Sequence, residues 1–119
     1  MAKTVVVPTA IVKDVVTASV LISGGTAINA ANQMQFAYPK EGKLLLRLNN
    51  TFAGAKNFTL VAGASSFVAS GQGDLVIAMA QNDDRQIIVS SDRFMNSAGQ
   101  VELSFEASTT GFVLAFYLP

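Results

Sequence analysis

The clearest pattern in this sequence is a two-residue alternation near its C-terminal end. Between Val101 and Ala107, three large apolar residues alternate with two glutamates and a serine. Successive side chains of a strand point to opposite faces, so this segment predicts a strand with one buried and one wet face. Every residue from Phe112 to Leu118 is apolar or aromatic, which predicts a strand that is covered on both faces or lies at a subunit contact. Ser108–Gly111 has the composition of a turn, so we expect these two strands to form a hairpin built into the core.

Four segments further upstream have the same strand character, and stretches rich in Gly, Asn, Ser and Asp separate them. They are Lys43–Asn49, Asn57–Ala62, Asp74–Ala80 and Gln86–Ser90. Short strands at a regular spacing, joined by such turns, are typical of all-β folds. We therefore predict a single-domain β-sandwich or jelly-roll-like barrel of about 6–8 strands.

The first part of the chain has a different character. Val and Ile recur between Val5 and Val16, and β-branched residues favour extended chain, whereas Pro8 cannot donate a ladder hydrogen bond. We predict that residues 1–23 form an extended N-terminal arm and that residues 24–119 form the β-sandwich domain. A helix over Ile11–Ile22 is the alternative. Thr26–Gln35 lacks a clear period and is interpreted as an irregular segment, with a short helix from residue 28 to residue 34 as the alternative.

Composition narrows the possible functions. Of the 119 residues, 50% are hydrophobic and 13% are charged, and the formal net charge is zero. The charged share is about half of the roughly 25% that is usual, which favours a surface partly covered by other protein. A balanced charge gives no electrostatic footprint for nucleic acid. No apolar stretch has the ~20 residues that a membrane helix needs. We therefore expect neither a nucleic-acid nor a membrane partner.

The residue types that carry most catalysis are missing or scattered. His and Cys are absent, which excludes Ser-His-Asp and Cys-His arrangements and removes the commonest metal ligands. The carboxylates are spread over turns and strand faces, and we interpret them as solvated. Asn82–Asp84 could contribute oxygen ligands to Ca²⁺, but the spaced acidic ladder of a calcium loop is lacking. We predict that the protein is not an enzyme and has no catalytic, cofactor-binding or metal-ligating residues, and hence no cofactor.

An ordered set of motifs resembles small structural proteins of tailed bacteriophages, encoded among the head genes near the major capsid protein. The resemblance covers the first residues and most of the chain from residue 42. The segments that carry it are Met1–Val6, Gly42–Asn50, Ala55–Gly63, Asp74–Ile77, Ser91–Phe94 with Asn96, Gly99–Phe105 and Leu118–Pro119.

This resemblance implies a virion structural protein that decorates and stabilises the capsid by binding across capsid-protein subunits. Its partner would be the major capsid protein, it would be a homo-oligomer with a trimer as the favoured state, and it would lie on the capsid surface after synthesis in the host cytoplasm. The alternatives are another virion component, such as a head–tail connector, a tail protein or a fibre-base protein, and a ligand- or carbohydrate-binding β-sandwich module.

The arm is the candidate attachment device. An apolar extended segment exposed on a monomer invites strand pairing with another chain. We therefore expect residues 4–16 to lie against a neighbouring subunit or the capsid protein. The predicted interface residues are the apolar anchors and the polar residues beside them: Lys3, Thr4, Val5, Val7, Ile11 and Lys13.

Overall fold

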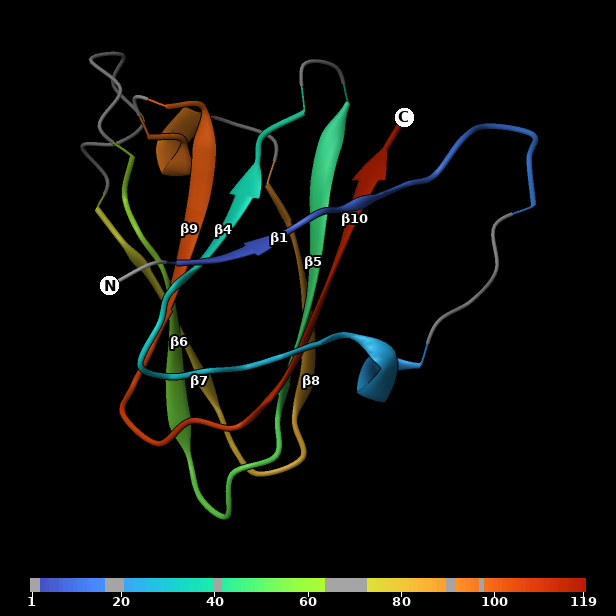
Figure 1. Cartoon of the computed structure of the whole chain (residues 1–119). Coiled ribbons are helices and arrows are strands. Elements are labelled where there is room, and N and C mark those ends of the chain that lie inside the picture. Colours follow the sequence, from blue (N-terminus) through green and yellow to red (C-terminus); the bar gives the residue numbers. More distant parts are fainter. Residues whose placement is uncertain (1–2, 17–20, 40–41, 64–72, 90–91, 97) are drawn as a thin grey trace.

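The computed structural model describes residues 3–16, 21–39, 42–63, 73–89, 92–96 and 98–119, and the strands in these ranges form two facing sheets (Figure 1). The predicted all-β sandwich is therefore confirmed. Ten strands are present in the described residues: β1 (Thr4–Val6), β2 (Thr9–Ala10), β3 (Thr26–Ala27), β4 (Met34–Ala37), β5 (Lys43–Asn50), β6 (Lys56–Leu60), β7 (Leu75–Met79), β8 (Asp84–Val89), β9 (Gln100–Phe105) and β10 (Gly111–Leu118). The described residues also form two single-turn 3₁₀ helices, η1 (Ile22–Gly24) and η3 (Asp92–Phe94).

The first sheet, sheet A, has the strand order β1-β4-β9-β6-β7, and the second, sheet B, has the order β2-β10-β5-β8 with β3 also paired to β10. The longest pairing joins β10 to β5 over all eight residues of each strand, from Gly111 opposite Asn50 to Leu118 opposite Lys43. All six strands predicted downstream of residue 42 are present. Sheet B is thus built around its two longest strands.

The predicted C-terminal hairpin is wrong, because β9 and β10 belong to different sheets. β9 pairs with β4 and β6, whereas β10 pairs with β2, β3 and β5. The connection over residues 106–110 crosses between the sheets, and the hydroxyl of Thr109 donates to the carbonyl of Glu106 within it, over 2.7 Å. The eight-residue pairing with β5 gives β10 a longer ladder than the six-residue β9 could offer.

The segment predicted to be irregular, Thr26–Gln35, begins with strand β3 and ends in the first half of strand β4, which runs between β1 and β9 in sheet A. Met34 and Phe36 point inward and are fully buried, whereas Ala37 is exposed. A strand of four residues is too short for its alternation to stand out from the surrounding polar residues. The count of about 6–8 strands was low for the same reason, since β1, β2 and β3 have only three, two and two residues.

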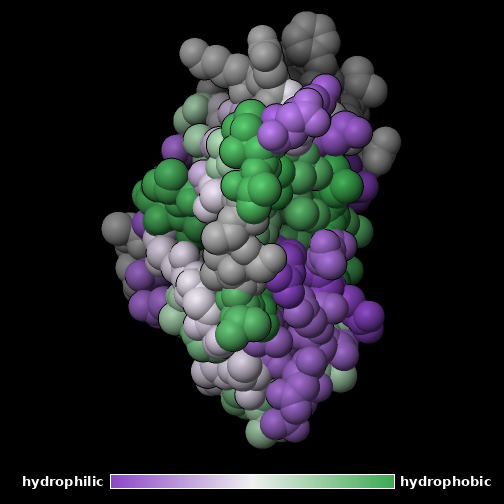
Figure 2. All heavy atoms as spheres, turned by 90° about the vertical axis from the view of Figure 1, so that its right-hand side faces the viewer, coloured by the Kyte–Doolittle hydropathy of each residue, from purple (hydrophilic) through white to green (hydrophobic). Residues whose placement is uncertain are grey.

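The apolar outer face of β10 is partly covered by the chain itself. Helix η1 packs over this strand, and a Cβ added to the adjoining Gly25 would lie 2.7 Å from the carbonyl oxygen of Val113. Phe112, Leu114 and Phe116 are accordingly half-buried on the outside of sheet B. Figure 2, viewed from the side of sheet B and the arm, shows hydrophobic surface gathered in the upper half of this face and hydrophilic surface at the lower right.

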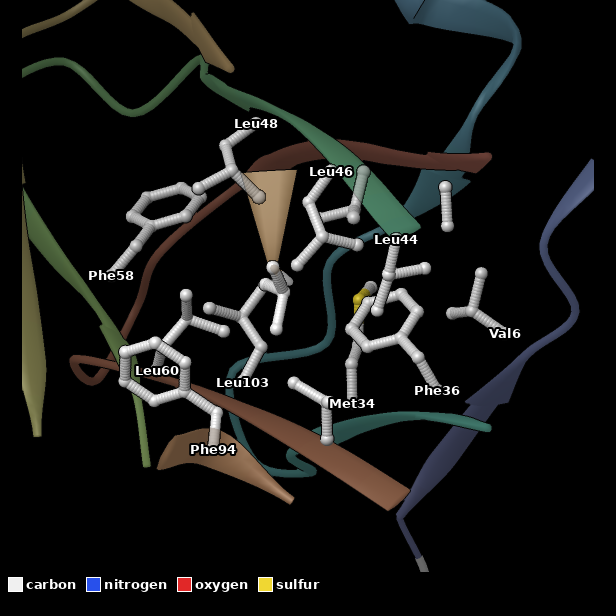
Figure 3. Packing of buried hydrophobic residues seen from close by; sticks show 14 of the residues in the cluster. Val6, Met34, Phe36, Leu44, Leu46, Leu48, Phe58, Leu60, Phe94 and Leu103 are labelled. Atoms are coloured by element: carbon white, nitrogen blue, oxygen red, sulfur yellow. The ribbon is translucent and has the colours of Figure 1, made fainter. Parts of the chain in front are cut away.

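The core fills the space between the sheets (Figure 3). Leu44, Leu46 and Leu48 alternate along β5 and are fully buried. From sheet A, Phe36 and Leu103 point toward them, as Figure 3 shows. Further buried members of this cluster are Val6, Met34, Phe58, Leu60, Met79, Val89, Phe94, Val101, Val113 and Ala115. The presence of Val6 means that the start of the arm belongs to the core.

Candidate interaction surface

The arm begins as part of the sandwich and then leaves it. Strand β1 pairs in parallel with β4 at the edge of sheet A, and β2 pairs in parallel with β10 at the edge of sheet B. Pro8, between them, is buried. After β2, the backbone N–H of Ile11 donates to the carbonyl of Tyr117 over 2.8 Å. Residues 4–10 therefore cross from one sheet to the other as a strap.

Beyond Ile11 the chain projects outward, as Figure 1 shows at its right-hand side. A turn begins there, in which the N–H of Val15 lies 3.4 Å from the carbonyl of Val12 and Asp14 has a φ of 60°. The chain returns to the body at η1, which packs on β10 and β5. We call residues 11–21 the arm loop, of which the structure describes residues 11–16 and 21.

The described part of the arm loop exposes large apolar side chains. The exposed fractions are 55% for Val12, 60% for Val15, 98% for Val16 and 80% for Leu21. Val7, between β1 and β2, adds a fifth at 84%. Four apolar side chains held this far into solvent on one projecting segment are a recognised feature of protein interaction sites.

A groove of about 510 Å³ lies where the arm loop leaves the body. Its walls come from the arm and from the C-terminal end of β10, and the residues lining it are Ala10, Ile11, Val12, Lys13, Gly42, Tyr117, Leu118 and Pro119. The Tyr117 hydroxyl donates to the carbonyl of Ala37 over 2.6 Å, and partial burial raises the pKa of this phenol. The groove is therefore mostly apolar, with the exposed Lys13 ammonium at its rim.

The structure divides the predicted interface residues into two groups. The backbone of Thr4 and of Ile11 is hydrogen-bonded to the protein's own body, and Lys3 forms an ion pair with Glu102. The side chains of Val5 and Val7 and the side chain of Lys13 face solvent, with exposed fractions of 63% and 84% for the two valines. Main-chain pairing of residues 4–6 and 9–10 is thus used within the chain, and contact with another protein at Val5, Val7 and Lys13 stays a prediction.

The six predicted interface residues do not include Val15, Val16 and Leu21, the three most exposed apolar residues of the described arm loop, although the predicted contact range 4–16 covers the two valines. The signal that could have found them is the run of β-branched residues on both sides of the charged pair Lys13–Asp14. In a strand of a two-layer sandwich these adjacent side chains would point to opposite faces, so one of the two charges would enter the core without a partner. The valines after it were therefore better candidates for exposed anchors than Ile11.

Two aspartates of the β7–β8 turn make structural contacts. Asp84 pairs with Arg47 over 3.1 Å, and a carboxylate oxygen of Asp83 accepts from the N–H of Ala80 over 2.9 Å. In the part of the chain that the structure describes, no group of three or more His, Cys, Asp or Glu side chains could hold a metal ion. Among the same residues, no helix is long and apolar enough to cross a membrane. The stretch that separates the predicted strands Asn57–Ala62 and Asp74–Ala80 lies largely outside the described residues.

Comparison with known proteins gives no relative from which a function could be transferred: no protein family, curated protein or solved structure matches this chain.

Proposed function

We propose that this chain is a virion structural protein that binds the outer surface of a bacteriophage capsid and stabilises the shell. Its partner is the major capsid protein, and it acts as a homotrimer without turning over a substrate. Two independent features support this proposal. One is the ordered set of motifs that resembles small phage head proteins. The other, which carries the structural argument, is the arm loop with its exposed apolar side chains Val12, Val15, Val16 and Leu21.

The binding free energy that one arm loop can contribute favours a target with many identical binding sites. Complete burial of a Val or Leu side chain contributes about 1.5–3 kcal/mol, so four partly exposed ones contribute on the order of 5–10 kcal/mol. Association itself costs about 4–15 kcal/mol in lost freedom of motion. One arm loop alone therefore binds weakly. Three loops on a trimer that meet three equivalent sites on a lattice reach useful avidity without any new type of contact.

Stabilisation follows from mass action. A ligand that binds the assembled shell but not its separate subunits lowers the free energy of the assembled state. A protein with this role needs no reactive group, only a rigid body and a contact element that reaches across a subunit boundary. The strap formed by residues 4–10 supplies a fixed base for the arm loop, because it pairs with both sheets.

The test is co-sedimentation with shells assembled from the major capsid protein that is encoded near this chain. A Val15→Asp/Val16→Asp double variant should keep the thermal stability of the parent, because both side chains are in solvent. It should lose at least about 10-fold in affinity, since each buried charge opposes binding by well over 1.4 kcal/mol.

Val76→Asp is the matched control. Val76 is 56% exposed on β7, at the far edge of sheet A from the strap, so this variant should bind like the parent. Full occupancy of shells by the Val15→Asp/Val16→Asp variant would contradict the proposed contact. The number of copies per virion distinguishes shell decoration, with hundreds of copies, from a connector or tail part, which is present as a single ring.

A further inference from the structure

Three polar side chains meet on the outer face of sheet A, where the start of β1 lies near β9. Lys3 precedes β1, Glu102 lies on β9, and Asn96 lies in the turn that leads into β9. The Lys3 ammonium and the Asn96 amide nitrogen both donate to one carboxylate oxygen of Glu102, Oε1, the amide over 3.0 Å. The side chains of Lys3 and Glu102 are 34% and 19% exposed, respectively. An amine, a carboxylate and a carboxamide are thus held in contact.

The Asn96 amide is also polarised from its other end. Its oxygen, Oδ1, accepts hydrogen bonds from the backbone N–H groups of Ala98, over 2.9 Å, and Gln100, over 3.0 Å. Backbone hydrogen bonds between Asn96 and Gln100 and between Gly99 and Asn96 fix the turn. Two N–H donors on one carbonyl oxygen are the arrangement that stabilises the negative charge of a tetrahedral intermediate in acyl transfer.

We propose that Lys3 and Asn96 react with each other to form an intramolecular isopeptide bond, with Glu102 as the proton carrier. Nζ of Lys3 forms a bond to Cγ of Asn96, and the Cγ–Nδ2 bond breaks. Of the two protons that the Lys3 ammonium loses, one passes through Glu102 to Nδ2, which leaves as ammonia. The second is released to water, where ammonia takes it up as ammonium. Glu102 ends as the carboxylate it was at the start, and the exchange needs no oxidant or reductant.

Glu102 has the position that a proton carrier between the two reacting residues requires. Glu102 touches both the attacking amine and the leaving nitrogen through the same oxygen, so one short movement of a proton serves both. Fixing two reactants in one structure replaces a bimolecular encounter by a unimolecular step. The hydrogen bond from Lys3 lowers the pKa of Glu102, so Glu102 starts as the carboxylate that can accept a proton. A bond that forms once in the life of each chain does not need a fast rate.

The bond would hold the first strand to the body. β1 has three residues and, among the described strands, pairs with β4 alone at the edge of sheet A, so few ladder hydrogen bonds hold it. A covalent link from residue 3 to residue 96 closes a long loop in the unfolded chain, which stabilises the folded state relative to it. The inference does not rest on capsid binding and holds for any function of the fold.

Intact-mass spectrometry of the purified full-length chain tests this directly. The expected mass is that of the sequence minus one molecule of ammonia, in freshly purified protein or after several days at room temperature. Digestion with trypsin should then give a peptide that ends at Lys13 joined to the C-terminal peptide that starts at Phe94, because trypsin cannot cleave after a linked Lys3.

Two conservative variants serve as controls. Lys3→Arg keeps a cation beside Glu102 but offers no lysine amine, so it should have the full sequence mass. Glu102→Gln keeps the shape of the side chain but cannot carry the proton, so linking should slow by about 100-fold or more. If the parent keeps its full mass, or if Asn96 is only hydrolysed to aspartate, the cluster is an ion pair and the proposal fails. Equal linking rates in the parent and Glu102→Gln would remove Glu102 from the reaction and overturn the mechanism.

Discussion

The neighbouring residues Val5 and Val6 allow one experiment to decide whether β1 is part of the sandwich. Val6 is 7% exposed and belongs to the core cluster, whereas Val5 is 63% exposed on the opposite face of the same strand. Truncating Val6 to Ala removes two buried methyl groups, worth about 1.6 kcal/mol in transfer free energy, and the cavity left behind raises the cost to about 2–3 kcal/mol. The same change at Val5 should cost roughly 0.5 kcal/mol from burial, in proportion to its buried fraction.

Both substitutions lower strand propensity by a similar amount, so this contribution cancels when the two variants are compared. The remaining difference is about 1.5–2.5 kcal/mol, which for a domain of this size corresponds to a Tm of Val6→Ala about 5–10 °C below that of Val5→Ala. Urea unfolding followed by circular dichroism should give the same order and unchanged m-values. Equal stabilities of the two variants would refute the docking of β1 and would restore the detached arm that the sequence predicted.

Three further changes test the fold and the Lys3–Glu102 pair. Gly111→Ala should prevent folding, because Gly111 has a φ of 148° and an added Cβ would lie 1.9 Å from a backbone oxygen of β5. Gly99→Ala is the control and should lower the free energy of unfolding by only about 1 kcal/mol. At Gly99 φ is 75° and nothing lies within 4 Å of an added Cβ. Leu103→Asp should leave no soluble folded protein, since Leu103 is fully buried and the carboxylate introduced there would have no partner. A normal melting curve for this variant would disprove the core position. The third change compares Lys3→Arg with Lys3→Met. Because the neighbouring cation lowers the folded-state pKa of Glu102 below 4.5, the pair stabilises the protein above that pH and the benefit is lost as the pH falls through the lowered pKa. The stability difference between the two variants should therefore shrink on acidification, and a constant difference would contradict this assignment.

The six strands after residue 42 could be predicted because each has at least five residues and a clear change of character at its ends. Their pairing could not be predicted in the same way. β9 and β10 are adjacent in sequence and separated by a turn, which is the usual signature of a hairpin, yet β10 pairs with β5, more than 60 positions away. The alternation along a strand shows which side chains are buried, but it carries no information about which strand lies alongside.

The candidate surface was only partly visible in the sequence for a related reason. Val6 and Val16 are the same residue type in the same kind of β-branched run, but Val6 is 7% exposed and Val16 is 98% exposed. Composition cannot separate them, because the difference depends on where the arm leaves the edge of sheet B after Ile11. The Lys3–Glu102–Asn96 cluster could not be predicted from the sequence, since it forms only because β4 brings β1 close to β9.

The proposed capsid contact and the proposed isopeptide bond are connected, because both determine how the arm responds to force. If the arm loop binds a capsid, any force on the contact reaches the body through η1 at one end and through β2 and β1 at the other. The strap resists poorly by hydrogen bonds alone, since β1 and β2 together have only five residues, and parallel pairing is slightly weaker per residue than antiparallel pairing. Once β2 gives way, β1 carries the load next. A covalent bond at Lys3 lies immediately beyond β1, so it would stop the strand from being pulled out while leaving the arm loop free to make its contact.

Lys3→Arg should then bind shells with the same affinity as the parent at rest. In a single-molecule pulling experiment it should release the shell, or unfold, at lower force than the parent. Identical rupture forces for the two proteins would show that the link has no mechanical role.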